Sequence, residues 1–188
     1  MVEAEKAIRF IDWTRKAGLV KRFHTMETHV LDRVAGHTYG VLNLIYILTY
    51  RKPSLNLMCA ALMHDNAECL LGDIPTNIKV QYPEIKEAIK RAEDKISKEY
   101  DVPKLNIEEG LILKTADILE GMYFSVEEVE RGNESLRRAF HVYFKKYFLS
   151  LEEKQQIPNV ELGMKIVIEL MGRMGTDTSI LEELKNGL

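Results

Sequence analysis

Long hydrophobic runs, abundant cysteine and a strong net charge are all missing from this chain of 188 residues. No stretch approaches the roughly 18–20 apolar residues that cross a bilayer. The charged N-terminus MVEAEKAIRFIDW has no apolar signal-peptide core. The two cysteines, Cys59 and Cys69, would lie about 15 Å apart along one helix, too far for a disulfide. We therefore expect a soluble protein of the reducing cytoplasm with no membrane partner.

The charged residues argue against nucleic acid as a partner. A net charge of −3 and the absence of a lysine and arginine stripe argue against nucleic-acid binding. The chain is 46% hydrophobic and 29% charged, which is ordinary for a globular protein. Its length suits one domain with a sizeable core and is short for two. We expect a single domain over residues 1–188.

Convincing alternation of β-branched residues is also missing, so no β-sheet is expected. Apolar residues recur instead at helical spacing, as in Val34, Val41 and Leu48, and Ser54 and Asn106 are suited to cap helices. The predicted fold class is all-α. The expected helices end near residue 17 and span about 34–48, 54–71, 83–100, 106–122, 134–149 and 159–172, with the segment 83–100 amphipathic and largely exposed.

Aromatic residues gather near the C-terminus at three- and four-residue spacing: Phe140, Tyr143, Phe144, Tyr147 and Phe148. Such a stripe is most simply the core-facing side of a helix. Aromatic density of this kind is also typical of subunit interfaces. We therefore predict a homo-oligomer.

Two histidines and two aspartates are candidate metal ligands. His64 and Asp65 are adjacent, His37 precedes them and Asp117 follows, each group on its own predicted helix. Alone, His37 is more typical of a core histidine and Asp117 of a buried ion pair, because a buried carboxylate is costly without a partner or cation. Together, imidazoles and carboxylates without thiolates suit one divalent ion: Co, Mn, Zn, Ni, Fe or Mg. The set predicts metal-assisted hydrolysis.

Two carboxylates follow this group along the chain. A continuous helix would place Glu68, four residues after His64, on the same face, where it could serve as general base or acid. A solvent-facing glutamate is the alternative. Asp73 lies in the segment GDIPTN and could bind a ribose hydroxyl, although Gly-Asp-x-Pro is also ordinary turn chemistry.

Three segments carry a family resemblance: HTYGVL, ALMHDNAECLLGDIPTNIK and LILKTADILEG. Their order and motifs resemble the HD-domain phosphohydrolases, and within them the 5'-deoxynucleotidase-like branch. The likeness covers roughly residues 18–125. It implies one HD-domain helical bundle with the metal site between helices, in which helices over 126–175 complete the bundle or an interface.

The resemblance also implies roles for single residues. Four side chains would hold one divalent cation: His37, His64, Asp65 and Asp117. Glu68, and with it Asp65, would take part in catalysis by activating or delivering the attacking water, and Asp73 would lie near the deoxyribose. The pair Arg22-Phe23 would contact phosphate and base, with phenylalanine where the family usually has tryptophan.

Basic residues near these motifs are candidates for neutralising phosphate charge: Lys21, Arg22 and Lys79. Each alone is more typical of a solvated surface. His24 and His29 could line the pocket, but we do not expect either to bind metal, because the segment that carries them has no helical scaffold.

The resemblance implies cleavage of the O5'–phosphorus bond of a 2'-deoxynucleotide. A phage-encoded branch converts dATP to deoxyadenosine and triphosphate, and the form VAGHTYGVL favours that reaction here, in the host cytoplasm if the chain is phage-encoded. The first alternative is a deoxynucleoside 5'-monophosphatase. A non-catalytic nucleotide-binding HD module and a purely structural helical protein are further alternatives, and retention of Glu68 argues against a binding module.

Overall fold

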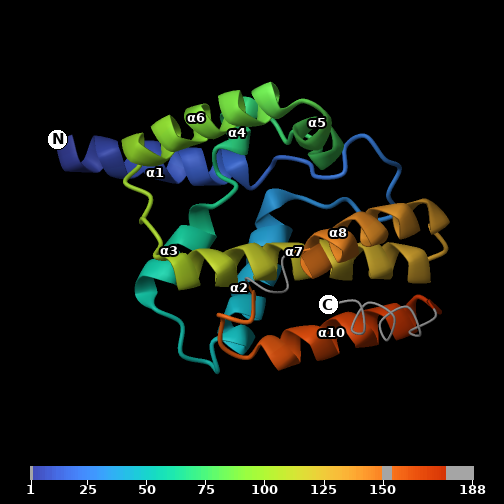
Figure 1. Ribbon diagram of the computed structural model, residues 1–188. Helices are drawn as coiled ribbons and strands as arrows, with labels where there is room; N and C mark the ends of the chain where they lie inside the picture. Colours follow the sequence, from blue (N-terminus) through green and yellow to red (C-terminus); the bar gives the residue numbers. More distant parts are fainter. Residues whose placement is uncertain (1, 150–153, 177–188) are drawn as a thin grey trace. The chain divides into compact units, whose positions relative to one another are not determined.

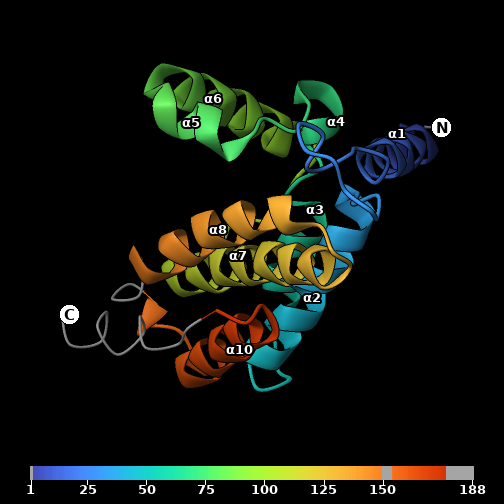
Figure 2. The same ribbon diagram turned by 90° about the vertical axis from the view of Figure 1, so that its right-hand side faces the viewer.

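A computed structural model describes residues 2–149 and 154–176. The regular elements in these ranges are helices (Figures 1 and 2), which confirms the predicted all-α class. In chain order they are α1 (Val2–Ala17), α2 (Val34–Leu48), α3 (Leu55–Met63), α4 (Glu68–Leu71), α5 (Thr76–Gln81), α6 (Pro83–Glu99), α7 (Ile107–Glu130), the short 3-10 helix η1 (Glu134–Leu136), α8 (Arg137–Leu149) and α10 (Val160–Arg173). Among these described helices, none combines the length and the apolar character needed to cross a membrane.

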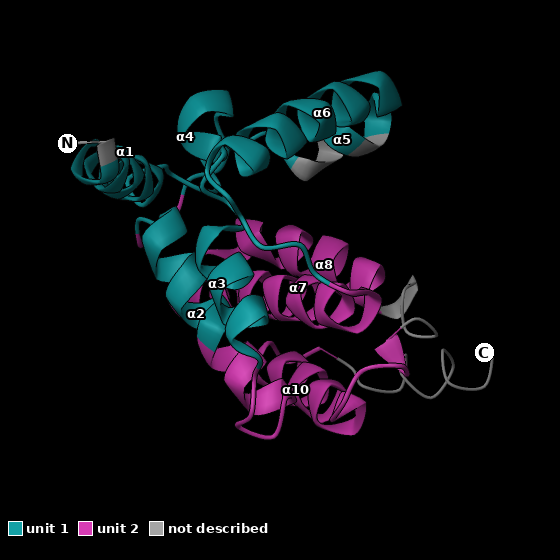
Figure 3. Cartoon of the chain, turned by 90° about the vertical axis from the view of Figure 1, so that its left-hand side faces the viewer, with its two compact units in different colours: residues 1–27, 31–42, 54–105 teal, residues 28–30, 43–53, 106–188 magenta. Residues whose placement is uncertain are grey.

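The chain divides into two compact units (Figure 3). The first comprises Met1–Glu27, Leu31–Leu42 and Ser54–Leu105, and the second comprises Thr28–Val30, Asn43–Pro53 and Asn106–Leu188.

In the first unit, α1 packs against α4. Trp13 of α1 is buried and stacks on Tyr100 with ring centroids 3.9 Å apart. The segment 18–33 folds back on itself, because the N–H of Val34 donates to the carbonyl of Val20 and the N–H of Arg22 donates to the carbonyl of Asp32. Helix α6 has no buried residue, as its amphipathic pattern predicted.

The second unit is built on α7, which packs against α8 and α10. The predicted cap Asn106 forms a reciprocal capping box with Glu109 at the start of α7. On α8, Phe140 and Tyr147 are fully buried, which confirms the core-facing interpretation for these two aromatic residues. The side chain of Phe148 lies outside the described residues. The homo-oligomer stays a prediction.

The expected helix over 54–71 is wrong in its second half. Helix α3 begins at the predicted cap Ser54 but ends at Met63. Residues 64–67 form a turn before the short helix α4. Within it, the N–H of Asn66 and that of Glu68 each donate to the carbonyl three residues back, tightening the chain relative to an α-helix. Helix α5 then occupies part of a segment expected to be a turn.

Candidate metal centre and active site

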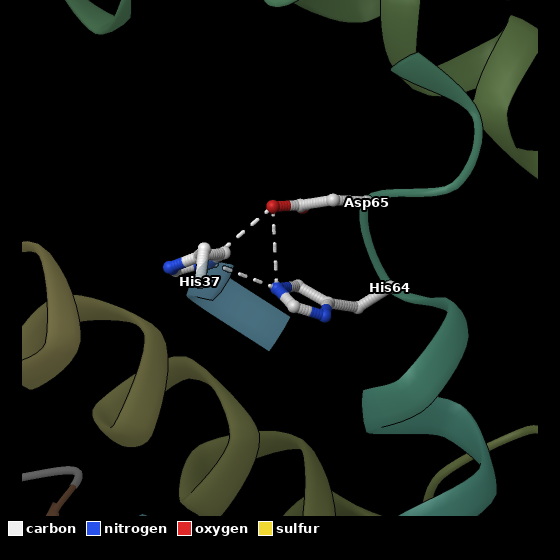
Figure 4. A group of neighbouring side chains, drawn as sticks. All are labelled: His37, His64 and Asp65. Atoms are coloured by element: carbon white, nitrogen blue, oxygen red, sulfur yellow. Dashed lines mark hydrogen bonds and ion pairs between the residues drawn. The ribbon is translucent and has the colours of Figure 1, made fainter. Parts of the chain in front are cut away.

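Three predicted ligands meet in the first unit (Figure 4). His37 projects from α2, whereas His64 and Asp65 come from the turn after α3. The Nε2 atoms of the two imidazoles are 3.2 Å apart, and each lies 3.3 Å from Oδ2 of Asp65. One ligand atom from each residue falls within 4.8 Å of the others. Short spacing between atoms of three different ligands is the arrangement that a single cation needs.

The other nitrogen of His64 fixes the orientation of its ring. Nδ1 lies 2.7 Å from the carbonyl oxygen of Ala61. Because a carbonyl can only accept, Nδ1 carries the proton, and in the neutral ring Nε2 presents a lone pair to the cluster. Metal-binding histidines are held by outer hydrogen bonds of this kind. The donor set therefore fits a divalent metal.

Asp65 is ionised at neutral pH. Burial alone would raise its pKa, but the charge of His64 and the hydrogen bond and charge of His37 outweigh burial and hold the pKa well below its usual range. A carboxylate that stays charged beside two imidazoles is a suitable hard ligand.

The pKa of Glu68 is shifted in the opposite direction from that of Asp65. Burial, followed by the negative charges of Asp65 and Asp73, raises the pKa of Glu68 to about 8. Its Oε2 atom is buried and has no hydrogen-bond partner among the described residues. A half-buried carboxyl group with a raised pKa near these candidate metal ligands is a candidate for proton transfer.

Three of the predicted substrate-binding residues lie within electrostatic reach of Glu68. The charge of Asp73 raises the pKa of Glu68, whereas the charges of Arg22 and Lys79 lower it. These three charged side chains therefore lie near Glu68, although the helix expected to align Glu68 with His64 is interrupted.

Arg22 is already engaged by a residue that was not predicted. Its Nη1 atom lies 2.9 Å from Oδ2 of Asp32, and both side chains are more than nine-tenths buried. The adjacent Phe23 adopts a left-handed backbone with φ of 52° and lies under the Arg22 guanidinium at 5.6 Å. A bulky residue in this region is strained by about 1–2 kcal/mol. The sequence did not predict the role of Asp32, because the two partners of this ion pair are ten residues apart in a segment without regular structure.

Two further predicted site residues are Lys21 and Asp117. Lys21 is exposed, and its backbone forms an isolated antiparallel bridge with Arg33. Asp117 lies half-buried on α7 in the second unit, so its role as fourth ligand remains a prediction.

The fold matches that of a protein of known structure. A crystal structure of an HD-domain phosphohydrolase from Listeria innocua superposes with a TM-score of 0.75, covering 97% of this chain and 99% of that one at 18% identity. This match shows an HD-domain fold.

A sequence model of the YfbR-like 5'-deoxynucleotidase family matches residues 9–106, a little over half of the chain. The chain belongs to that family, which confirms the resemblance seen in its motifs and identifies it as an HD-class hydrolase. No protein with a curated description matches significantly.

Proposed function

We propose that this chain is a metal-dependent phosphohydrolase that cleaves the O5'–phosphorus bond of 2'-deoxynucleotides. The observation that carries the proposal is the cluster of His37, His64 and Asp65 with Glu68 beside it. Membership of a 5'-deoxynucleotidase family supports the substrate class.

The ligand set is proposed as His37, His64 and Asp65, with Asp117 as the fourth member. A divalent ion bound there would polarise a phosphoryl oxygen and lower the pKa of a water molecule. Co, Mn, Zn, Ni, Fe and Mg all accept nitrogen and oxygen ligands.

Glu68 is the proposed acid–base group. Its carboxylate accepts a proton from the attacking water as the water oxygen bonds to phosphorus. The O5'–phosphorus bond breaks, and the nucleoside leaves when O5' gains a proton. A bound cation would favour the ionised form of Glu68 and offset part of the raised pKa that burial produces.

The remaining residues are proposed to hold the substrate. Arg22, Lys79 and Lys21 offset phosphate charge, with Arg22 oriented by Asp32. Asp73 accepts a hydrogen bond from the sugar. Phe23 offers a ring for stacking on the base.

Two more specific proposals differ in the number of phosphates that the substrate carries. The family match favours a 5'-monophosphate such as dAMP, whereas the form of the first motif favours dATP with release of triphosphate. Both reactions break the same bond.

Incubating the purified protein with Mn or Co and either dAMP or dATP tests the proposal, with both products identified by chromatography. Orthophosphate from dAMP supports the monophosphatase, and triphosphate plus deoxyadenosine from dATP supports the triphosphohydrolase. Tight nucleotide binding without any product would favour the binding-module alternative.

We also propose that the protein is a homo-oligomer that acts on nucleotides in the cytoplasm. Light scattering tests the first point, and a monomeric mass would refute it.

A further inference from the structure

His24, which has no role in the reaction described above, lies beside Asp73, the residue proposed to bind the sugar. Nδ1 of His24 lies 3.5 Å from Oδ2 of Asp73. The two residues come from distant segments, His24 from the irregular chain before α2 and Asp73 from the turn after α4. Both belong to the first unit, and neither is a candidate metal ligand.

The residue directly before each partner has a positive φ, which is strained for Phe23 and ordinary for Gly72. Phe23, directly before His24, has φ of 52°, and Gly72, directly before Asp73, has φ of 75°. The N–H of Arg22 donates to the Asp32 carbonyl and the N–H of Met26 donates to the carbonyl of Phe23, so the chain is fixed on both sides of His24. A left-handed residue kept in place by such bonds is typical of a functional position.

Asp73 lies near the proposed acid–base group, because its charge is one cause of the raised pKa of Glu68. Its side chain is 22% exposed, so the carboxylate remains accessible. With Oδ2 facing His24, Oδ1 can accept a hydrogen bond from a ligand.

The chemistry of the substrate limits what that donor can be. A carboxylate repels phosphate and attracts a hydroxyl. In a 2'-deoxynucleoside 5'-phosphate the only free sugar hydroxyl is the one on C3'. We propose that His24 is a positioning residue that orients Asp73 to accept the 3'-hydroxyl of the nucleotide. This inference rests on the proposed function.

Steady-state kinetics with two substrates tests the role of His24. The substrates are dAMP and 2',3'-dideoxyadenosine 5'-monophosphate, which lacks the hydroxyl, or the corresponding triphosphates if those are turned over. His24→Ala should lower kcat/KM for the hydroxyl-bearing substrate about three- to tenfold, mainly through KM. For the dideoxy substrate the change should stay under about twofold, because the oriented group has no partner there.

Two further variants separate positioning from folding. His24→Asn keeps a donor near the position of Nδ1 and should restore most of the lost selectivity. Thr25→Ala, at the exposed neighbouring position, should leave both substrates unaffected. Asp73→Ala should abolish the preference for the hydroxyl, and adding His24→Ala should change nothing further.

The outcomes distinguish this inference from the proposed function. Equal losses on both substrates in His24→Ala, or full selectivity in that variant, would overturn the positioning role while leaving the hydrolase proposal intact. If the wild-type protein hydrolyses neither the monophosphates nor the triphosphates, the proposed function fails and the positioning role fails with it.

Discussion

The Nε2 atoms of His37 and His64 face each other at 3.2 Å, and both contact the same oxygen of Asp65. The proton on Nδ1 of His64, held by the Ala61 carbonyl, leaves its Nε2 as an acceptor when the ring is neutral. Two imidazoles and a carboxylate arranged in this way form a group that could hold a divalent cation.

Asp65→Ala should therefore remove metal and activity together. The substitution takes away the only charged ligand among the three clustered residues. Elemental analysis of the purified protein and a turnover assay measure the two effects. Asp94→Ala, at an exposed position of α6, is the matched control and should retain both. Full metal content in Asp65→Ala would contradict the assigned ligand set.

Glu68→Gln should separate metal binding from catalysis. The amide fills a similar volume but cannot accept the proton of the attacking water, so kcat should fall by about 10²–10⁴-fold. Metal content should stay at the wild-type level, because Glu68 is not part of the ligand cluster. Normal turnover by this variant would show that another group carries the proton.

The raised pKa of Glu68 predicts how the stability of the metal-free protein depends on pH. Between its ordinary pKa of 4.5 and the folded value of about 8, the folded state binds one more proton than the unfolded state. Stability contributed by this group therefore falls as pH rises through the window, by up to about 1.4 kcal/mol per pH unit. Urea unfolding in EDTA from pH 5 to 8 should show wild type losing stability relative to Glu68→Gln. A constant difference would contradict the assignment.

Glu128 should be a strong determinant of stability. Its side chain is fully buried and accepts hydrogen bonds from the backbone N–H of His29 and Val30 and from the amide of Asn133. These bonds outweigh burial and hold its pKa below the usual range. Glu128→Ala removes three hydrogen bonds to a carboxylate and leaves a gap at a fully buried position, and it should cost about 2–4 kcal/mol of unfolding free energy.

The neighbouring Glu127→Ala is the control for this effect. Glu127 forms a partly exposed ion pair with Arg131 at 3.6 Å, and its loss should cost under about 1 kcal/mol. Equal losses in the two variants by chemical denaturation would contradict the proposed importance of Glu128.

Two glycines of α7 should respond to alanine in opposite directions. A Cβ at Gly121 would lie 2.6 Å from the Tyr143 ring, whereas a Cβ at Gly110 meets nothing within 4 Å. Gly121→Ala should destabilise the protein by about 1–3 kcal/mol through overpacking. Gly110→Ala should be neutral or stabilise it by up to about 1 kcal/mol through helix propensity. Thermal unfolding of both variants measures the contrast, and a stable Gly121→Ala would show that α8 is not packed closely there.

The sequence predicts local features of this molecule better than long-range pairs. The caps at Ser54 and Asn106 and the exposed face of α6 follow from residue type and spacing, and the structure confirms them. The break after Met63 was missed because residues 64–67 contain neither glycine nor proline.

Some tertiary pairs near the site could be predicted from sequence motifs and others could not. His37, His64 and Asp65 could be grouped by their motif. The ion pair of Arg22 with Asp32 and the approach of His24 to Asp73 have no sequence periodicity, because they depend on how irregular segments fold.

The most direct test of the central claim is hydrolysis of dAMP and of dATP in ¹⁸O-labelled water with Mn or Co, followed by mass spectrometry of both products. Attack of water on the phosphorus next to O5' predicts label in the released orthophosphate or triphosphate and none in deoxyadenosine. Label in the 5'-hydroxyl of deoxyadenosine, or the absence of product from both nucleotides, would contradict the account.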